Sequence, residues 1–264
     1  INIYLGEIMS SRQLKKGLIP ETKELDNIYD NFIVEKNPPL PYIIQHFKSL
    51  EGEGGDNAVG LTTLFLRLNK CNLSCNFCDT SFSIKGDEKY NIVRADTDLT
   101  ELLNEKYSEE DRKYIHSCSI TGGEPLIHLE YFEDIIEELL ESFNGINHII
   151  VETNGLYLYK KENAMKFAEL SNIYADRIKF TLSISPKLDA RVSYGKAGRN
   201  GDINEKNILD IYEVVFKNYK RYLTNVVNIQ CKFVHSQVLK ESNEPLMDII
   251  INNNYMYPRT KILI

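Results

Sequence analysis

The 264-residue sequence lacks the long apolar runs of membrane proteins. No segment approaches the roughly 18 apolar residues of a membrane-spanning helix, and the first residues contain neither the basic nor the apolar region of a secretory signal. Hydrophobic residues make up 42% of the chain and charged residues 26%, as in globular proteins. We therefore expect a cytoplasmic protein with no membrane partner, folded as one large domain or two small ones.

The sequence also lacks clusters of basic residues. Its 31 Lys and Arg stand against 38 Asp and Glu, which gives a formal net charge of −7. Pairs such as Lys160–Lys161 and Lys220–Arg221 are typical of solvated helix faces. Because a nucleic-acid backbone is bound by clustered Lys and Arg, we expect no nucleic-acid partner. A small-molecule substrate fits this composition better.

The five cysteines are neither even in number nor dispersed, so they do not indicate a secreted disulfide framework. Cys71, Cys75 and Cys78 follow the spacing C-x3-C-x2-C, and no second C-x2-C pair is present. A structural zinc ion would need a fourth ligand, for which Cys118 and His116 are available. However, Cys118 and Cys231 lie in apolar strands, where a lone cysteine is usually part of the core. A zinc site and a [4Fe–4S] cluster with one open iron both remain possible on spacing alone.

Alternating strand and helix patterns begin at about residue 61. We expect strands at 61–68, 117–121, 148–151, 178–184, 226–234 and 261–264. We expect helices at 99–107, 131–143, 162–170, 206–219 and 245–253. This rhythm predicts an α/β fold with parallel strands and crossover helices, arranged as an open or closed barrel.

The two ends of the chain differ from this pattern. Residues 1–44 include a proline-rich joint at 37–41 and are expected to form an N-terminal extension, followed by a core domain at 45–264. The sequence begins at Ile1 without a methionine and stops at Ile264, inside an expected strand. We therefore expect further residues beyond both ends, including a C-terminal tail.

Four polar motifs follow the first four expected strands. They are the cysteine segment 71–78, GGEP at 122–125, ETNG at 152–155 and SISPK at 183–187. Each of the last three is, taken alone, compatible with an ordinary turn. Because the C-terminal ends of parallel strands meet at one edge of a sheet or barrel, these motifs should converge on one site.

In this order the motifs resemble those of the radical S-adenosylmethionine (SAM) superfamily, including the aromatic Phe77 before the last cysteine. The resemblance implies a modified, partial (β/α)6 barrel. It implies that the three cysteines hold a [4Fe–4S] cluster whose fourth iron is chelated by SAM. The residues that would contact SAM are Phe77, Gly122, Gly123, Glu124, Glu152, Thr153, Asn154, Ser183, Ser185 and Lys187.

The flanking residues resemble one branch of that superfamily, the 7-carboxy-7-deazaguanine synthases. The similar stretches are SLEGEG at 49–54, FLRLNKCNLSCNFCDT at 65–80, SPK at 185–187 and KFV at 232–234. The resemblance implies conversion of 6-carboxy-5,6,7,8-tetrahydropterin to 7-carboxy-7-deazaguanine with loss of ammonia, on the route to queuosine-type 7-deazapurines. SAM would be cleaved to a radical that removes the hydrogen at C6 of the pterin.

The same resemblance assigns roles to three further residues and to partners. Glu53 and Arg67 would bind the pterin, where a carboxylate suits the donor edge of a guanine-like ring and Arg suits a substrate carboxylate. Thr80, which follows Asp79, would bind Mg²⁺. A flavodoxin or ferredoxin would donate the electron, and the enzyme would be a homodimer.

Three features depart from the pattern of the branch. Glu51 replaces a glutamine and adds charge near the site, Lys70 replaces a glycine before the first cysteine, and the C-terminal region is divergent or absent. A homologue acting on another pterin is one alternative. An activase that generates a glycyl radical on a partner enzyme is a second, and a zinc-binding interaction protein without enzymatic activity is a third.

Overall fold

A computed structural model describes residues 22–32, 39–52, 58–84, 87–201, 203–233, 245–250 and 262–263. The strands are β1 (Tyr42–Leu50), β2 (Thr62–Leu68), β3 (Val93–Arg94), β4 (Ser117–Gly122), β5 (His148–Thr153), β6 (Lys179–Ile184), β7 (Val227–Lys232) and β8 (Ile262–Leu263). The helices are α1 (Thr22–Phe32), α2 (Ser81–Ile84), α3 (Leu99–Lys106), α4 (Glu109–Tyr114), α5 (Phe132–Ser142), α6 (Lys161–Ile173), α7 (Ala190–Ser193), α8 (Gly195–Asn200) and α9 (Glu205–Asn218). Short helical turns cover Glu88–Tyr90, Pro125–Tyr131, Leu156–Tyr159 and Tyr219–Leu223, and residues 245–250 are also helical.

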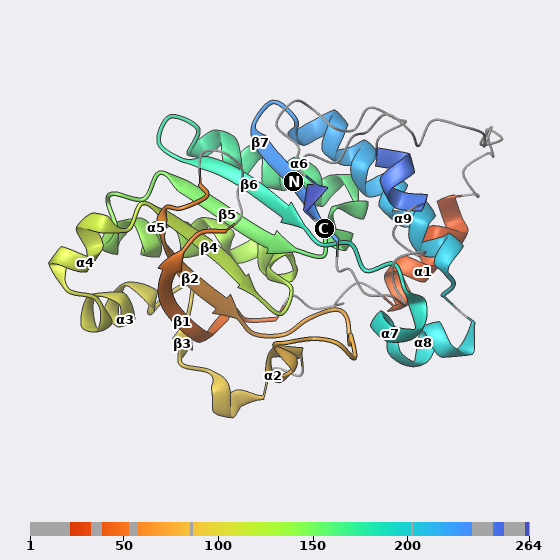
Figure 1. Cartoon of the computed structure of the whole chain (residues 1–264), viewed down its shortest axis with the longest axis horizontal. Helices are drawn as coiled ribbons and strands as arrows, with labels where there is room; N and C mark the ends of the chain where they lie inside the picture. Colours follow the sequence, from red (N-terminus) through yellow and green to blue (C-terminus); the bar gives the residue numbers. More distant parts are fainter. Residues whose placement is uncertain are drawn as a thin grey trace.

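The strands form one mixed sheet in the order β3-β1-β2-β4-β5-β6-β7-β8. From β2 to β8 every neighbouring pair is parallel, which confirms the predicted β/α rhythm and gives six parallel strands in the described residues. The prediction omitted β1 and β3, which add an antiparallel edge to β2. In Figure 1 the arrowheads of β2, β4, β5 and β6 point to the same side of the molecule, where α2, α7 and α8 lie.

One face of the sheet is apolar because alternate strand residues point to it. The register aligns Leu64 and Leu66 of β2 with Cys118 and Ile120 of β4, and the pattern continues across the sheet through Ile149, Phe180 and Val227. All of these side chains are buried. Phe180 contacts Phe167 of α6 with ring centroids 6.0 Å apart, and Phe167 contacts Phe132 of α5 at 6.2 Å. Helices therefore cover this face.

The opposite face is polar. Its strand positions, read from the same register, are Thr63, Phe65 and Arg67 of β2; Ser117, Ser119 and Thr121 of β4; His148, Ile150 and Glu152 of β5; Thr181 and Ser183 of β6; and Asn228, Gln230 and Lys232 of β7. A buried strand face with so many hydrogen-bonding groups departs from ordinary core packing. Such a face is suited to a polar ligand.

The predicted helices are present because their apolar residues recur at helical spacing. In α5 the residues Phe132, Ile135, Ile136 and Leu139 are buried. The N-terminus of α9 is closed by a capping box, in which Asn204 and Asn207 each accept a backbone N–H from the other. The prediction missed α7 and α8, which follow β6 as two short helices.

The prediction also missed α1, which lies in the expected N-terminal extension. Tyr29 of α1 stacks on Tyr159 with ring centroids 4.7 Å apart, and Lys160 forms an ion pair of 2.9 Å with Asp26. The first core strand, β1, begins at Tyr42 and spans the predicted boundary between residues 44 and 45. These contacts join α1 to the turn that follows β5.

None of the helices in the described ranges is long and apolar enough to cross a membrane.

Candidate active site

The cysteine loop leaves the C-terminal end of β2 through Lys70, whose φ of 61° lies in the left-handed region. The backbone N–H of Leu73 donates to the sulfur of Cys71 at 3.4 Å, and the N–H of Ser74 donates to the carbonyl of Ser193 at 3.0 Å. Burial raises the pKa of the Cys71 and Cys75 thiols. These thiols therefore keep their protons until a metal replaces them.

The candidates for a fourth zinc ligand lie away from this loop. Cys118 is fully buried near the start of β4, and His116 is exposed just before that strand. Cys118 lies four positions before Gly122, which stands at the loop end of β4, and this is about 13 Å along a strand. Within the described residues, no three His, Cys, Asp or Glu side chains lie close enough to hold one metal ion. A [4Fe–4S] cluster binds each cysteine through a different iron, so it needs a wider spacing than a single zinc ion.

The GGEP segment packs directly against the loop. The N–H of Gly123 donates to the carbonyl of Leu68 at 3.0 Å, and the N–H of Glu124 donates to the carbonyl of Lys70 at 2.8 Å. Gly122 has a φ of 123°, a conformation that other residues rarely adopt. The two glycines thus allow the end of β4 to reach the backbone just before Cys71.

Glu124 is buried, with 1% of its surface exposed, at the centre of the site. One carboxylate oxygen accepts the N–H of Leu126 at 3.0 Å and the hydroxyl of Thr153, and the other accepts the N–H of Asn154 at 2.7 Å. Burial raises the pKa of Glu124 to about 7, although these hydrogen bonds oppose the rise. Near neutral pH the carboxyl can therefore change its charge when a cation binds beside it.

Asn154 joins the GGEP and ETNG segments to the cysteine loop. Its side-chain amide donates to the Oδ1 of Asn72 at 2.8 Å, and its own Oδ1 accepts the N–H of Leu156 at 3.0 Å. Its backbone carbonyl accepts the hydroxyl of the buried Tyr212 at 2.8 Å. Every polar group of Asn154 is therefore engaged in holding the site together.

Lys187 supplies a positive charge beside the cysteines. Its Nζ donates to the hydroxyl of Ser185 at 2.7 Å and lies 5.9 Å from the ring centroid of Phe77. Burial lowers the pKa of Lys187, whereas the nearby Cys75 raises it. Tyr194 and Tyr212 hold the lysine backbone from either side through hydrogen bonds of 3.0 and 2.9 Å. This lysine can compensate an anionic group at the loop.

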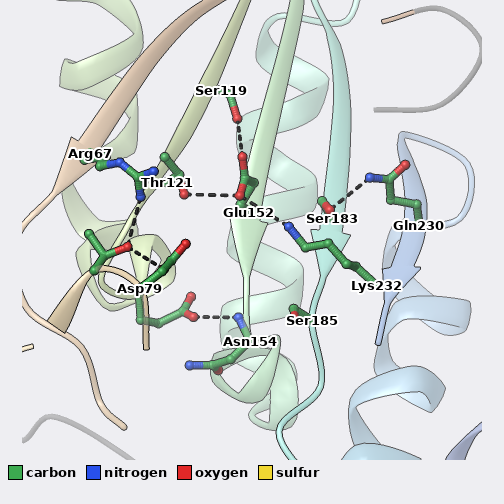
Figure 2. A network of polar contacts seen from close by, with 12 residues as sticks. Arg67, Asp79, Ser119, Thr121, Glu152, Asn154, Ser183, Ser185, Gln230 and Lys232 are labelled. Atoms are coloured by element: carbon green, nitrogen blue, oxygen red, sulfur yellow. Dashed lines mark hydrogen bonds and ion pairs between the residues drawn. The ribbon is translucent and has the colours of Figure 1, made fainter. Parts of the chain in front are cut away.

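A second cluster begins on β2, where the side chains of Arg67 and Asp79 both contact the hydroxyl of Thr80. Arg67 and Asp79 are labelled in Figure 2. Nη1 of Arg67 donates to Thr80 Oγ1 at 3.1 Å, and this hydroxyl donates to Asp79 at 2.7 Å. The guanidinium also lies 5.8 Å from the ring centroid of Phe47. An arginine and a hydroxyl–carboxylate pair therefore adjoin the cysteine loop on its C-terminal side.

A third cluster lies on the polar face of the sheet (Figure 2). Glu152 accepts the hydroxyls of Ser119 at 3.0 Å and Thr121 at 3.3 Å, and it forms an ion pair of 3.5 Å with Lys232. On the neighbouring strands, Nε2 of Gln230 donates to the hydroxyl of Ser183 at 3.0 Å. The polar face thus carries a carboxylate, an ammonium group and an amide.

Comparison with known proteins assigns this arrangement to a family. The model of the radical SAM superfamily matches residues 66–230, which contain the cysteine loop, GGEP, ETNG and most of the polar face.

The chain belongs to the radical SAM superfamily.

Curated relatives narrow the similarity within the superfamily. The chain is 29% identical over 185 residues to 7-carboxy-7-deazaguanine synthase of Methanothermobacter thermautotrophicus, covering 70% of this chain and 68% of that protein. It is 31% identical over 158 residues to 7-carboxy-7-deazaguanine synthase of Neisseria meningitidis, covering 54% of this chain and 67% of that protein. The crystal structure of QueE from Escherichia coli is a weaker match, with a TM-score of 0.44, 18% identity, and coverage of 84% of this chain and 93% of that chain.

Membership of the radical SAM superfamily confirms the predicted superfamily and its partial barrel. It also implies that the protein is an enzyme with a [4Fe–4S] cluster and SAM as cofactors. The donor set fits a cluster: three thiols from one loop, an N–H donor to Cys71 and a nearby ammonium group. The predicted convergence at one edge of the sheet is present, since hydrogen bonds link Glu124, Thr153 and Asn154 to the cysteine loop.

The structure places two other residues that were expected at or near the site, Phe77 and Glu51, at the rim of the cysteine loop or away from it. Glu53 lies outside the described residues. Phe77 is 38% exposed, so it lies at the rim of the loop. The charge of Glu51 was expected near the site, but the residue is buried beside Leu61, at the opposite end of β2 from the cysteines. The reason is that β1 runs antiparallel to β2, which brings its end to the start of β2.

Several site residues were missed from the sequence. They are Asn72, Ser119, Thr121, Tyr212 and Gln230. A signal was present in the strands, because Ser117, Ser119 and Thr121 repeat every second residue and so do Thr181, Ser183 and Ser185. Polar residues with a period of two in a buried strand indicate a polar inner face.

Proposed function

We propose that this radical SAM enzyme is a 7-carboxy-7-deazaguanine synthase, which converts 6-carboxy-5,6,7,8-tetrahydropterin to 7-carboxy-7-deazaguanine with loss of ammonia, in queuosine-type biosynthesis. The names of the curated relatives support the product, 7-carboxy-7-deazaguanine. The observation that carries the proposal is the contact between Arg67 and Thr80, because it brings a carboxylate-binding side chain against the cysteine loop. The substrate is a carboxylate, and Arg binds such groups through paired hydrogen bonds.

We propose that Cys71, Cys75 and Cys78 hold the [4Fe–4S] cluster and that SAM binds between the cluster and the polar face. When bound, these cofactors supply an organic radical that removes a hydrogen atom from the substrate. The residues proposed to contact SAM are Phe77, Gly122, Gly123, Glu124, Glu152, Thr153, Asn154, Ser183, Ser185 and Lys187. The chain itself orients both ligands and excludes water from them.

Glu124 is proposed to receive the amino group of SAM. A carboxylate has about four acceptor positions, and Leu126, Thr153 and Asn154 occupy three of them. One position is left for an N–H donor. Such a donor favours the ionised carboxylate and lowers its pKa below the value of about 7 found without a ligand. Asn154 would then act on SAM mainly by holding Glu124 and the cysteine loop.

Asp79 and Thr80 are proposed to form the protein side of a Mg²⁺ site. Mg²⁺ is commonly held by one or two protein oxygens together with oxygens of the substrate and water. The Thr80 hydroxyl is 2.7 Å from the Asp79 carboxylate and 3.1 Å from the Arg67 guanidinium. A substrate carboxylate that bridges the ion and Arg67 would be fixed in orientation.

The pterin ring is proposed to lie along the polar face, with Glu53 binding its guanine-like edge. A flat heterocycle with several donors and acceptors matches the hydroxyl, amide and carboxylate groups of Ser119, Gln230 and Glu152. Further proposals are a flavodoxin or ferredoxin as electron donor, a homodimer, a cytoplasmic location, and an N-terminal extension at 1–44 before a core at 45–264.

The function is tested by reconstituting the protein with iron and sulfide without oxygen, and then adding SAM, dithionite, Mg²⁺ and the carboxypterin. The proposal expects 7-carboxy-7-deazaguanine by mass spectrometry, and it expects Arg67→Met to lose this product while 5′-deoxyadenosine still forms. Formation of 5′-deoxyadenosine by the wild-type protein without any deazaguanine would reject the substrate and leave the radical SAM class intact.

A further inference from the structure

Asn72 lies next to the first cysteine and has no assigned role in the site above. Its Oδ1 accepts from Asn154 at 2.8 Å and lies 3.9 Å from the sulfur of Cys71. The amide group of Asn72 is therefore beside a sulfur that would become a cluster ligand. Asn154, its partner, stands at the end of β5 on the other side of the site.

The hydrogen-bond network fixes which way both amides face. The backbone N–H of Leu156 can only donate, so the Asn154 atom that faces it at 3.0 Å must be the oxygen. The amide nitrogen of Asn154 is then turned toward Asn72. The Asn72 atom that it meets at 2.8 Å must in turn be the oxygen. We refer to this directed chain of Leu156, Asn154 and Asn72 as the amide relay.

The amide relay leaves the Nδ2 group of Asn72 as its free end. This nitrogen is buried and has no hydrogen-bond partner among the described residues. A buried N–H group without an acceptor destabilises the fold, so such groups are rare unless a ligand satisfies them. The relay also prevents the side-chain amide of Asn72 from rotating by half a turn, because the NH₂ group of Asn72 would then face the NH₂ group of Asn154.

We propose that the Nδ2 group of Asn72 donates a hydrogen bond to a sulfur atom of the [4Fe–4S] cluster and thereby sets its reduction potential. This inference rests on the cluster of the proposed function and adds a positioning residue to it. Reduction adds negative charge to the cluster, and an N–H donor to its sulfur stabilises that charge. The donor therefore raises the potential and eases electron entry from the reductant.

The experiment compares reduction potentials in the full-length, reconstituted protein by redox titration followed by electron paramagnetic resonance. Asn72→Ala removes the amide. Asn72→Asp keeps an oxygen that can accept from Asn154, so it keeps the loop anchored if Asn72→Ala fails to assemble a cluster. Asn76→Ala is the matched control, because Asn76 is an exposed asparagine in the same loop. We expect the equilibrium constant for reduction of the cluster to be about tenfold lower in both Asn72 variants than in the wild type. For one electron this is a shift of the reduction potential by about 59 mV to more negative values. The control should stay at the wild-type value.

A double-mutant cycle tests the direction of the relay. An aspartate in place of Asn154 still accepts the N–H of Leu156 but cannot donate to Asn72, so the Asn72 amide should turn its oxygen toward the cluster. Asn154→Asp should therefore lower the potential in the wild-type background and lower it less in the Asn72→Ala background. Equal shifts in the two backgrounds would mean that the Asn154→Asp substitution acts only through its added charge, and this would overturn the relay.

Unchanged potentials in both Asn72 variants would overturn the proposal. Weaker SAM binding with an unchanged potential would also overturn it, because the amide would then serve SAM and not the cluster. The potential is read without substrate, so it does not depend on the identity of the product. A wild-type protein that forms the cluster but makes no deazaguanine would reject the substrate, and the potentials would still decide the role of Asn72.

Discussion

Gly123 lies against the backbone carbonyl of Lys70, so that a Cβ atom added to Gly123 would lie 1.6 Å from that oxygen. The same carbonyl accepts the N–H of Glu124 at 2.8 Å. The end of β4 and the start of the cysteine loop are therefore in direct backbone contact. In this protein the first two motifs of the site form one structural unit.

Gly123→Ala should separate this unit. Because the added methyl group would meet backbone and not a flexible side chain, the loop has to move, and we expect a destabilisation of about 3 kcal/mol or more together with loss of bound iron. Urea unfolding and iron analysis measure both effects. Gly52→Ala is the control, since nothing lies within 4 Å of its added Cβ. Equal iron content in the two variants would contradict the packing described here.

Lys70→Gly should stabilise the protein. Lys70 has a φ of 61°, which costs a residue with a Cβ atom about 1 kcal/mol, whereas glycine adopts it freely. We expect the free energy of unfolding to rise by up to about 1 kcal/mol in urea titrations. Lys70→Ala keeps the Cβ atom and should give no such gain. If Lys70→Ala stabilises the protein as much as Lys70→Gly, the free-energy cost at this position comes from the lysine side chain beyond Cβ and not from the positive φ angle.

The affinity for SAM should rise with pH across neutrality. Glu124 has a pKa raised to about 7 by burial, and its ionised form is the stronger acceptor for the amino group of SAM. As the pH rises from about 6 to about 7.5, a growing fraction of Glu124 is ionised and the affinity should increase several-fold. The amino group of SAM has to be unprotonated to bind iron, so the affinity should not fall as the pH rises further to about 8. Equilibrium dialysis of labelled SAM at a series of pH values measures this curve.

Glu124→Gln is the matched variant for the pH experiment. It cannot ionise, so its affinity should be low and should rise less between about pH 6 and 7.5 than that of the wild type. The rise would be assigned to another group if the variant retained it in full.

His128 should be essential for stability. It is fully buried, with Nδ1 2.9 Å from the carbonyl of Pro39 and Nε2 2.8 Å from the carbonyl of Asn69. Burial lowers the pKa of His128, and a neutral imidazole donates one N–H. His128→Leu leaves at least one buried carbonyl group without a donor, and we expect a loss of about 1–3 kcal/mol in the free energy of unfolding. His116→Leu changes an exposed histidine and should alter stability by less than about 0.5 kcal/mol. If the free energy of unfolding changes little in His128→Leu, water molecules donate to these carbonyl groups in place of the imidazole ring.

Much of the parallel sheet could be predicted because its strands are rich in β-branched and apolar residues and because a polar or turn motif follows each of the first four. Strand β1 was missed because its sequence, YIIQHFKSL, follows a proline-rich joint and mixes apolar with charged residues. Its pairing with β2 is a long-range contact that no local pattern encodes. Helix α1 was missed for a related reason, since its buried side chains, including Tyr29, pack on residues more than 120 positions away.

The candidate site was likewise predictable where short motifs define it and not where long-range contacts do. The cysteines, Glu124 and Lys187 could be named from short motifs, because each motif combines several uncommon residues at fixed spacing. Asn72 could not be singled out, since its role depends on an amide 82 residues away that only the fold brings within 2.8 Å. The strain at Lys70 likewise appears only once the backbone path of the loop is known.

The most direct test of the account is the metal content of the cysteine loop, read together with its response to SAM. The full-length protein reconstituted without oxygen should contain about four iron and four sulfide per chain, and SAM should change the electron paramagnetic resonance spectrum of the reduced cluster, because one iron is left without a protein ligand. A protein that instead holds one zinc ion per chain, without sulfide and without a response to SAM, would contradict the account.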